Sequence, residues 1–268
     1  MYMFLVFLNV VIAFVLLEIA VTGLTWTGWR PNPDLENAAQ VAAGILLLVV
    51  PGLVIVRQVQ RAAVTGTMVQ VSRSQFPDLH ATAMDFAQKL GIPKPPAVFL
   101  ANGNGTLNAF AAQSGTDKNY VVLSNELFVN LHRDNREGLR FILGHEMAHI
   151  RLSHVALWYQ LSICFSGGLP ILGPTLSRLR EYSCDRNGAT LEPNGQLGLI
   201  MLTAGRYAHD QVEVQELVVQ GKELQGFWVE FGQLVRSHPW TVRRLWRLYQ
   251  LGLFGPMPPS LEAQPRRP

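Results

Sequence analysis

Two long apolar stretches near the N-terminus constrain the fold of this chain more than any other feature. Residues 1–24 carry a single charged side chain, Glu18, and a second apolar stretch extends from Ala38 to Val56. Each stretch is about as long as the 20 or so apolar residues with which a helix crosses a bilayer. A cleavable signal peptide is the alternative for the first stretch, but no positively charged segment precedes it and its apolar run is longer than usual. We therefore predict a transmembrane hairpin of two helices over residues 1–58.

The residues that flank these stretches indicate an orientation. Trp26, Trp29 and Arg30 follow the first stretch, where aromatic and basic side chains anchor a span at the interface. Basic residues are more frequent after the second stretch, where Arg57, Arg61 and Arg73 follow one another. Because cytoplasmic loops carry an excess of Lys and Arg, we expect a multi-pass protein of the cell membrane whose remaining chain faces the cytoplasm.

Two polar or helix-breaking features lie inside the apolar stretches. Pro51-Gly52 is expected to kink the second helix. Glu18 is costly in lipid, so we expect it to face the other helix, a water-filled cavity or a partner. Alternatively, it lies close enough to the outer interface to reach water.

Composition excludes one class of partner. The 268 residues are 49% hydrophobic and 15% charged, and the net charge of +3 forms no basic stripe with interleaved aromatic residues, so we expect no nucleic acid partner. The two cysteines, Cys164 and Cys184, form no CxxC pair and cannot make a disulfide framework. The oligomeric state has no signature in the sequence.

The chain beyond the hairpin has the pattern of an α+β body over residues 59–254. Apolar residues recur at helical spacing from Ser72 to Leu90, and Gly91 closes that helix. Short apolar runs at residues 97–100, 107–112 and 120–123 predict a small sheet, and further helices are expected over residues 124–131 and 138–153. The Pro-rich residues 255–268 are expected to form a disordered tail.

A possible metal site lies on the helix predicted over residues 138–153. In His145-Glu146-Met147-Ala148-His149 the two histidines are four residues apart and share one helix face, so both imidazoles can bind one ion. Glu146 can then take a proton from a water on that ion. The alternative is a chance HExxH pattern on a surface helix.

A third ligand is expected near residue 181. Glu181 and Asp185 are four residues apart, so one carboxylate can bind the metal while the other orients an imidazole. Alternatively, both acids pair with neighbouring arginines on a solvated helix. His154 is about 140° round the helix from His149, and we interpret it as a surface or interfacial residue. Cys184 is interpreted as a small buried residue.

Residues 155–177 contain no charge and are long enough for a third span. If Glu181 and His149 bind one ion, both ends of this stretch must emerge on the same side of the membrane, which excludes a single crossing. A re-entrant hairpin turning at Gly167-Gly168, a helical pair lying against the membrane and a buried part of the body all remain possible.

In this combination the motifs resemble the HtpX-like and CAAX-prenyl-endopeptidase family of membrane zinc metalloproteases. The resemblance covers the HExxH, Glu181-x-x-x-Asp185, the Asn108-Ala109-Phe110-Ala111 segment, and Ser237-His238-Pro239 with Arg244 behind it. The chain departs from the family in its short stretch between the two zinc motifs and in lacking the many spans of the prenyl-protein proteases.

The resemblance implies a mainly helical, zincin-like domain that binds one Zn²⁺ per chain and hydrolyses protein or peptide substrates. His145, His149 and Glu181 would be the zinc ligands, Glu146 the base that activates the zinc-bound water, and His238 a group near the transition-state oxyanion. Asp185 and Arg244 would support the ligands, and an edge strand with Asn108, Ala109 and Phe110 would bind substrate. By its own sequence, His238-Pro239 equally marks a turn, and Arg244 can be a plain surface residue.

The function expected from the resemblance is that of a membrane-anchored zinc endopeptidase, with a role in quality control of membrane proteins. Two alternatives stay open on the sequence alone. The first is a membrane-anchored interaction or regulatory protein that is related to metalloproteases but does not cut peptides. The second is a zinc hydrolase that acts on something other than peptide.

Overall fold

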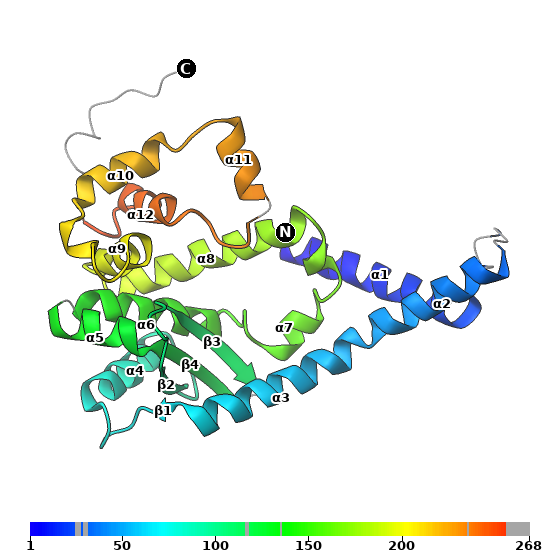
Figure 1. Cartoon of the computed structure of the whole chain (residues 1–268), viewed down its shortest axis with the longest axis horizontal. Helices are drawn as coiled ribbons and strands as arrows, with labels where there is room; N and C mark the ends of the chain where they lie inside the picture. Colours follow the sequence, from blue (N-terminus) through cyan, green and yellow to red (C-terminus); the bar gives the residue numbers. More distant parts are fainter. Residues whose placement is uncertain (25–27, 29–31, 116–117, 135, 235, 256–268) are drawn as a thin grey trace.

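The computed structural model describes residues 1–24, 28, 32–115, 118–134, 136–234 and 236–255. A body of helices and one small sheet carries a helical hairpin that projects from one end (Figure 1). The expected anchors Trp26, Trp29 and Arg30 and the tail after residue 255 lie outside the described residues.

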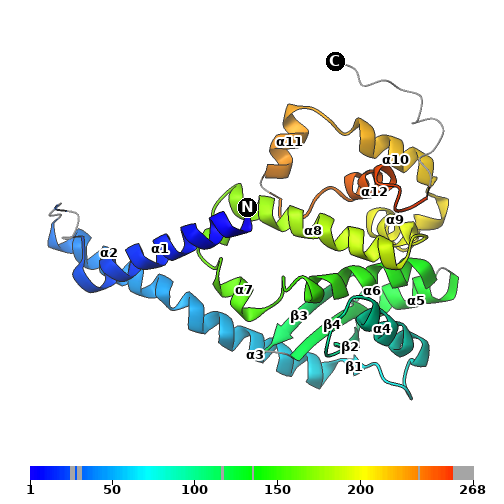
Figure 2. The same ribbon diagram turned by 180° about the vertical axis from the view of Figure 1, so that it is seen from behind.

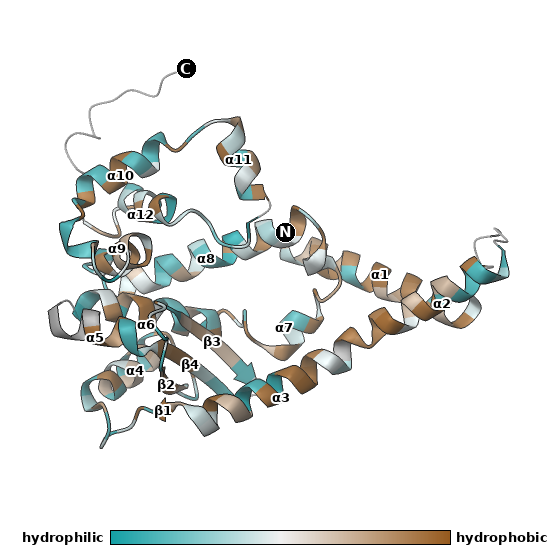
Figure 3. Ribbon diagram, viewed as in Figure 1, coloured by the Kyte–Doolittle hydropathy of each residue, from teal (hydrophilic) through white to brown (hydrophobic). Residues whose placement is uncertain are grey.

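The hairpin consists of α1 (Tyr2–Thr22), α2 (Pro33–Leu47) and α3 (Val49–Thr67). Two stretches, Tyr2–Thr22 and Pro33–Thr67, are long and apolar enough to cross a membrane. Only 11% and 6% of their most apolar windows are buried by the rest of the chain, and Figure 3 shows the apolar residues spread over the hairpin. Apolar surface exposed to this extent is typical of a membrane-contacting or partner-contacting segment.

The expected break in the second apolar stretch lies at Leu48, between α2 and α3. Pro51 has no N–H to donate to the carbonyl of Leu47, and its ring clashes with that group, so the helix is interrupted one turn before the proline. The helix then continues to Thr67, so the boundary expected at residue 58 falls inside α3. Glu18 is half-buried one turn before the end of α1.

The sheet has four strands in the order β1-β2-β4-β3. They are β1 (Val69–Gln70), β2 (Ala97–Ala101), β3 (Ala109–Ser114) and β4 (Lys118–Ser124). β2 and β4 are parallel, and β3 pairs antiparallel with β4 in a register that places Phe110 opposite Val122. Three strands were expected; β1 is only two residues long, too short to produce an alternating pattern.

Alternation along the strands buries both faces of the sheet. Val98 and Val121 point into the main core, together with α4 (Pro77–Lys89) and α6 (Arg136–Arg151). Phe99, Tyr120 and Val122 point to the other face and pack on Val64 of α3. The helix expected from Ser72 begins only at Pro77, because proline is favoured in the first helical turn and Phe76 before it has a φ of 64°.

Residues 155–177 do not form a single crossing. They contain the short helix α7 (Leu157–Leu161), a 3-10 turn at Ser166–Gly168 and the start of α8 (Leu172–Leu191). The chain thus returns to the body, and α8 lies along α6 (Figure 2). The remaining described helices cover the body: α5 (Asn125–Asp134), α9 (Gln196–Ala204), α10 (Val214–Glu223), α11 (Phe227–Leu234) and α12 (Thr241–Gln250).

Candidate metal centre

Close contact between α6 and α8 brings the two sequence motifs together. Gly144 and Gly188 face each other, and a Cβ atom built on Gly188 would lie 3.1 Å from the carbonyl oxygen of Phe141 and 3.2 Å from the backbone nitrogen of His145. Only glycine allows the helix backbones to approach this closely. The contact positions His145 and His149 of α6 against Glu181 of α8.

The three side chains present their ligand atoms at one point. The Nε2 atoms of His145 and His149 are 3.3 Å apart, and Glu181 carboxylate oxygens lie 3.5 Å from the first and 3.4 Å from the second. His145 and Glu181 are 6% exposed, so water does not screen these groups. They form a cluster of the type that can hold a metal ion.

Asp185 and Arg244 support His145 from behind. Nδ1 of His145 is 2.9 Å from Oδ1 of Asp185, and Arg244 donates to both Asp185 oxygens at 2.8 and 2.6 Å. Asp185 is 1% exposed and Arg244 8%. The choice left open for Arg244 is thus decided: it binds Asp185, and it is not a surface residue.

The pKa values follow from burial and these contacts. Burial lowers the pKa of His145, but the hydrogen bonds to Asp185 and Glu181 outweigh it and raise the pKa to about 9. Burial raises the pKa of Glu181, yet its bonds to His145, His149 and His238 hold that pKa far below the usual range. Burial likewise raises the pKa of Asp185, and Arg244 outweighs it and lowers the pKa. Glu181 and Asp185 are therefore carboxylates, the form that a metal site requires.

His154 is not the surface or interfacial residue that we expected. It is buried, and its Nδ1 lies 3.3 Å from Nδ1 of His149. α6 ends at Arg151, and Ser153 has a φ of 60°, which turns the chain so that the His154 N–H bonds the carbonyl of His149. Counting 100° per residue fails here because the helix has already ended, and Ser153 lacks the glycine signal of such an ending.

The environment of His154 keeps it neutral. Burial, and then the nearby Arg180, lower its pKa to about 3. A neutral Nδ1 can accept the Nδ1–H of His149, which leaves the His149 Nε2 lone pair directed at the cluster. Cys184, fully buried as expected, has its sulfur 3.6 Å from the same nitrogen, and burial raises the pKa of this thiol.

The hydrogen bonds at the Nδ1 atoms of His145 and His149 leave their Nε2 atoms available to a cation. A bound cation would replace the protons through which the two Nε2 atoms bond Glu181, and each ring would then keep its proton at Nδ1, facing Asp185 or His154. Without either such a cation or the shared protons, three electron-rich atoms at 3.3 to 3.5 Å would repel one another.

A small cavity of about 140 Å³ opens beside the cluster. Half-buried Glu146 lines it together with Asn108 and Ala109. His238 lines it as well, with its Nδ1 3.4 Å from a Glu181 oxygen and its side chain 66% exposed. The hydrogen bond to Glu181 raises the pKa of His238. The residues from four separate sequence motifs thus meet at one cavity, to which Leu202 of α9, without a motif of its own, also contributes.

The expected substrate strand lies at the edge of the sheet next to this cavity. Asn108 immediately precedes β3 and pairs through its backbone with Ser124 at the end of β4. Ala109 and Ala111 face the main core, whereas Phe110 points to the other side of the sheet. Glu126 orders the preceding turn by accepting the N–H groups of Gly103 and Gly105.

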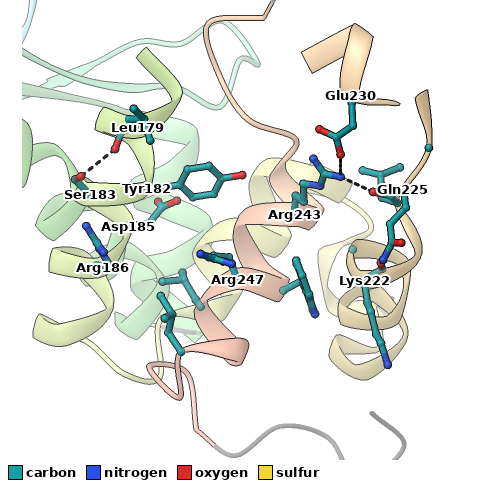
Figure 4. Close-up of a pocket in the computed structure, with 16 residues that line it drawn as sticks. Leu179, Tyr182, Ser183, Asp185, Arg186, Lys222, Gln225, Glu230, Arg243 and Arg247 are labelled. Carbon is teal, nitrogen blue, oxygen red and sulfur yellow. Dashed lines mark hydrogen bonds and ion pairs between the residues drawn. The ribbon is translucent and has the colours of Figure 1, made fainter. Parts of the chain in front are cut away.

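A larger cavity of about 790 Å³ lies between α8, α10 and α12 and contains none of the three ligand residues (Figure 4). Its wall includes Asp185, Arg186, Arg243 and Arg247. Arg243 is engaged by Glu230, as Figure 4 shows. The His145, His149 and Glu181 cluster thus lies beside the smaller of these two cavities.

Comparison with known proteins agrees with this geometry. Residues 73–169 match the family model described as Peptidase family M48. A protease HtpX homologue of Thermococcus kodakarensis is 33% identical over 160 residues, covering 45% of this chain and 53% of the relative. One of Pyrococcus abyssi is 25% identical over 229 residues, covering 68% of this chain and 76% of the relative.

The coverage is partial for all of these relatives, and it is smaller for others. A protease HtpX homologue of Streptococcus uberis is 25% identical over 133 residues, and this chain spans only 43% of its length. No solved structure matches the chain significantly. The family match over residues 73–169 and these relatives support an HtpX-like metalloprotease of family M48, and the HExxH helix lies within the matched residues.

Proposed function

We propose that this chain is a membrane-anchored zinc endopeptidase with one Zn²⁺ held by His145, His149 and Glu181. The observation that carries the proposal is the spacing of the ligand atoms, 3.3 to 3.5 Å. A tetrahedral zinc with bonds of about 2.0–2.1 Å holds its ligand atoms about 3.3–3.4 Å apart. Two imidazoles and a carboxylate form the ligand set of a catalytic zinc that keeps a fourth position free.

Zinc, when bound, supplies a Lewis acid that polarises a carbonyl and makes water nucleophilic near neutral pH. Glu146, in the same cavity, takes the proton of the attacking water and passes it to the leaving amine. His238 donates a hydrogen bond to the oxyanion, a contribution of about 3 kcal/mol in other hydrolases. Asp185 and Arg244 orient His145, and Asn108, Ala109 and Phe110 belong to the substrate strand.

The edge of β3 favours a peptide over other hydrolysable substrates. In its register with β4, even-numbered residues exchange hydrogen bonds with β4, so the N–H and C=O groups of Ala109 and Ala111 point to the open side. An extended peptide can add there as a further strand. The pairing would end at Gln113, whose carbonyl already accepts the Arg57 Nε–H at 2.8 Å.

The membrane anchor is the second part of the proposal. We infer that α1 and the α2–α3 stretch cross the cell membrane and that residues 59–254 form the zincin-like peptidase domain on the cytoplasmic side, which would give access to faulty membrane proteins. The exposed apolar surface of the hairpin supports the spans. Arg57 and Arg61 support the orientation because they add to the basic residues that follow the second stretch. Both also contact the body: Arg57 donates a hydrogen bond to Gln113, and Arg61 lies over the Tyr120 ring.

The test compares glutamine substitutions of two glutamates on the same helix, α6. Glu146→Gln should retain about one zinc per chain and lose cleavage of an unfolded reporter protein, whereas Glu137→Gln, in the exposed first turn of α6, should keep both. His149→Ala should lose the zinc. Cleavage by purified Glu146→Gln would refute the role of Glu146. A wild-type chain without zinc would refute the enzyme and favour the interaction or regulatory protein.

A further inference from the structure

Large apolar side chains that are exposed outside the hairpin gather at one end of the body. Beyond α3, the described residues include six that are at least half exposed: Trp158, Ile171, Tyr207, Phe227, Trp228 and Phe231. All but Tyr207 lie on α7, before α8 or on α11. Phe227, Trp228 and Phe231 form one cluster, with ring centroids 5.0 to 6.1 Å apart.

α7 lies at the level where both apolar stretches meet the body (Figure 1). On the α1 side, the ring of Tyr159 stacks on Tyr2 at 4.7 Å, and Ser162 is 2.9 Å from the Tyr2 hydroxyl. On the α3 side, Arg57 donates to Gln160 at 2.8 Å and to the carbonyl of Val155. α7 therefore joins the start of α1 to the middle of α3.

Contacts of α1 place this level within the lipid-facing part of the hairpin. Met3 and Phe7 of α1 are 74% and 67% exposed, so the face open to lipid begins in the first turn. Asn9 lies six residues beyond Met3, which is about 9 Å further along the helix. Its Oδ1 accepts the N–H groups of Phe165 and Ser166 at 2.8 and 3.3 Å. Irregular backbone is tolerated at such a depth only where protein satisfies its polar groups, as Asn9 does here.

α11 is fastened to the same end of the body. Buried Arg178, in the first half of α8, donates to the carbonyls of Gln233 and Arg236 and, at 2.8 Å, to the hydroxyl of Thr175. The neighbouring Leu176 packs in one cluster with Leu5 of α1. The aromatic cluster of α11 is thus held beside the beginning of the membrane hairpin, and Figure 1 shows α11 and the N-terminus at the same end.

We propose that α7, the turn up to Ile171 and the aromatic cluster of α11 insert into the headgroup region of the membrane that the hairpin crosses. The body then rests against the leaflet on the side of the N-terminus. Aromatic side chains favour this region because a ring combines an apolar surface with tolerance of polar neighbours. We assign the lipid surface as the partner of this cluster because the hairpin already holds the body next to the membrane. The cluster can then contact lipid without a separate binding step. The inference rests on the proposed membrane spans and is independent of catalysis.

The test uses the full chain in lipid nanodiscs with a fluorophore at a single introduced cysteine. In a Cys164→Ser background the remaining Cys184 is fully buried. Probes at Trp228→Cys and Phe231→Cys should lose fluorescence with spin-labelled lipids and be shielded from aqueous iodide. Tyr207→Cys, whose native side chain is 79% exposed, should show the reverse, and Phe14→Cys on α1 should be quenched by the lipids.

Each other outcome overturns the proposal in a different way. If the α11 probes behave like Tyr207→Cys while Phe14→Cys is quenched by lipid, the hairpin crosses the membrane but the body does not dock. If they are shielded from iodide and not quenched by lipid, a protein, such as a second copy of this chain, covers the cluster. If lipid does not quench Phe14→Cys either, the membrane spans are wrong and docking fails with them.

Discussion

His154 offers a quantitative test of how the metal centre is assembled. It lies outside the proposed ligand set, and its Nδ1 is 3.3 Å from Nδ1 of His149. His154→Ala removes the acceptor and leaves the Nδ1–H of His149 without its partner. The His149 side chain is 12% exposed, so water can replace only part of the lost bond.

The magnitude follows from that unsatisfied donor. A buried donor without a partner costs about 1–3 kcal/mol, and about 1.4 kcal/mol corresponds to a factor of ten in affinity. The bond is longer than the usual 2.9–3.0 Å and the site is partly accessible, so the lower half of the range applies. We expect zinc affinity to fall about tenfold, at the lower end of the roughly 10- to 100-fold known for such supporting residues.

The assay is competition for zinc between the purified protein and a chelator of known affinity. His154→Asn is the matched variant, because its Oδ1 takes the place of the imidazole Nδ1 and should restore most of the affinity. A circular dichroism spectrum and melting curve show whether each variant is folded. If His154→Ala binds zinc as tightly as the wild type, or if the asparagine variant is no better than alanine, the role of His154 as a positioning residue is refuted.

Three further predictions concern the surroundings of the site. Asp185→Asn leaves the buried Arg244 without its carboxylate, a loss worth about 3–5 kcal/mol of stability, and a double variant with Arg244→Met should recover part of it in thermal unfolding. Gly188→Ala should force α6 and α8 apart and weaken zinc binding, since the added Cβ meets backbone atoms at 3.1 and 3.2 Å; an unchanged zinc affinity would contradict this contact. Asn9→Leu leaves the N–H groups of Phe165 and Ser166 unpaired, costing about 1–3 kcal/mol for each group, and should speed proteolysis between residues 161 and 171, with Asn37→Leu on exposed α2 as the control.

The elements that could be predicted are those with a repeating local signal. The helix around His145 follows from apolar residues at a period of 3.6, and the strands β2 and β4 follow from short continuous apolar runs. Their limits differ from the expected ones by a few residues. β1 was not predicted because a strand of two residues shows no recognisable pattern. The start of α4 was predicted too early because Phe76 takes a left-handed conformation, which its residue type does not indicate.

For the candidate site as well, the local features could be predicted from the sequence and the long-range contacts could not. HExxH and Glu181-x-x-x-Asp185 each specify, within one helix, which side chains share a face, and that much needs no tertiary structure. Which partner each side chain meets depends on contacts over long sequence distances. Arg244 of α12 binds Asp185, and His154 reaches His149 only because Ser153 ends α6.

The sequence by itself thus predicted the apolar hairpin and the helix with two histidines on one face, and it excluded a single crossing by residues 155–177 on the condition that Glu181 and His149 bind one ion. Those properties depend on periodicity and length, which are local. The tertiary structure decided which side chains contact His145 and His149 and where α7 and α11 lie. It did so because Gly144 and Gly188 let α6 and α8 approach, and because Asn9, Arg57 and Arg178 tie the returning chain and α11 to the hairpin and to α8.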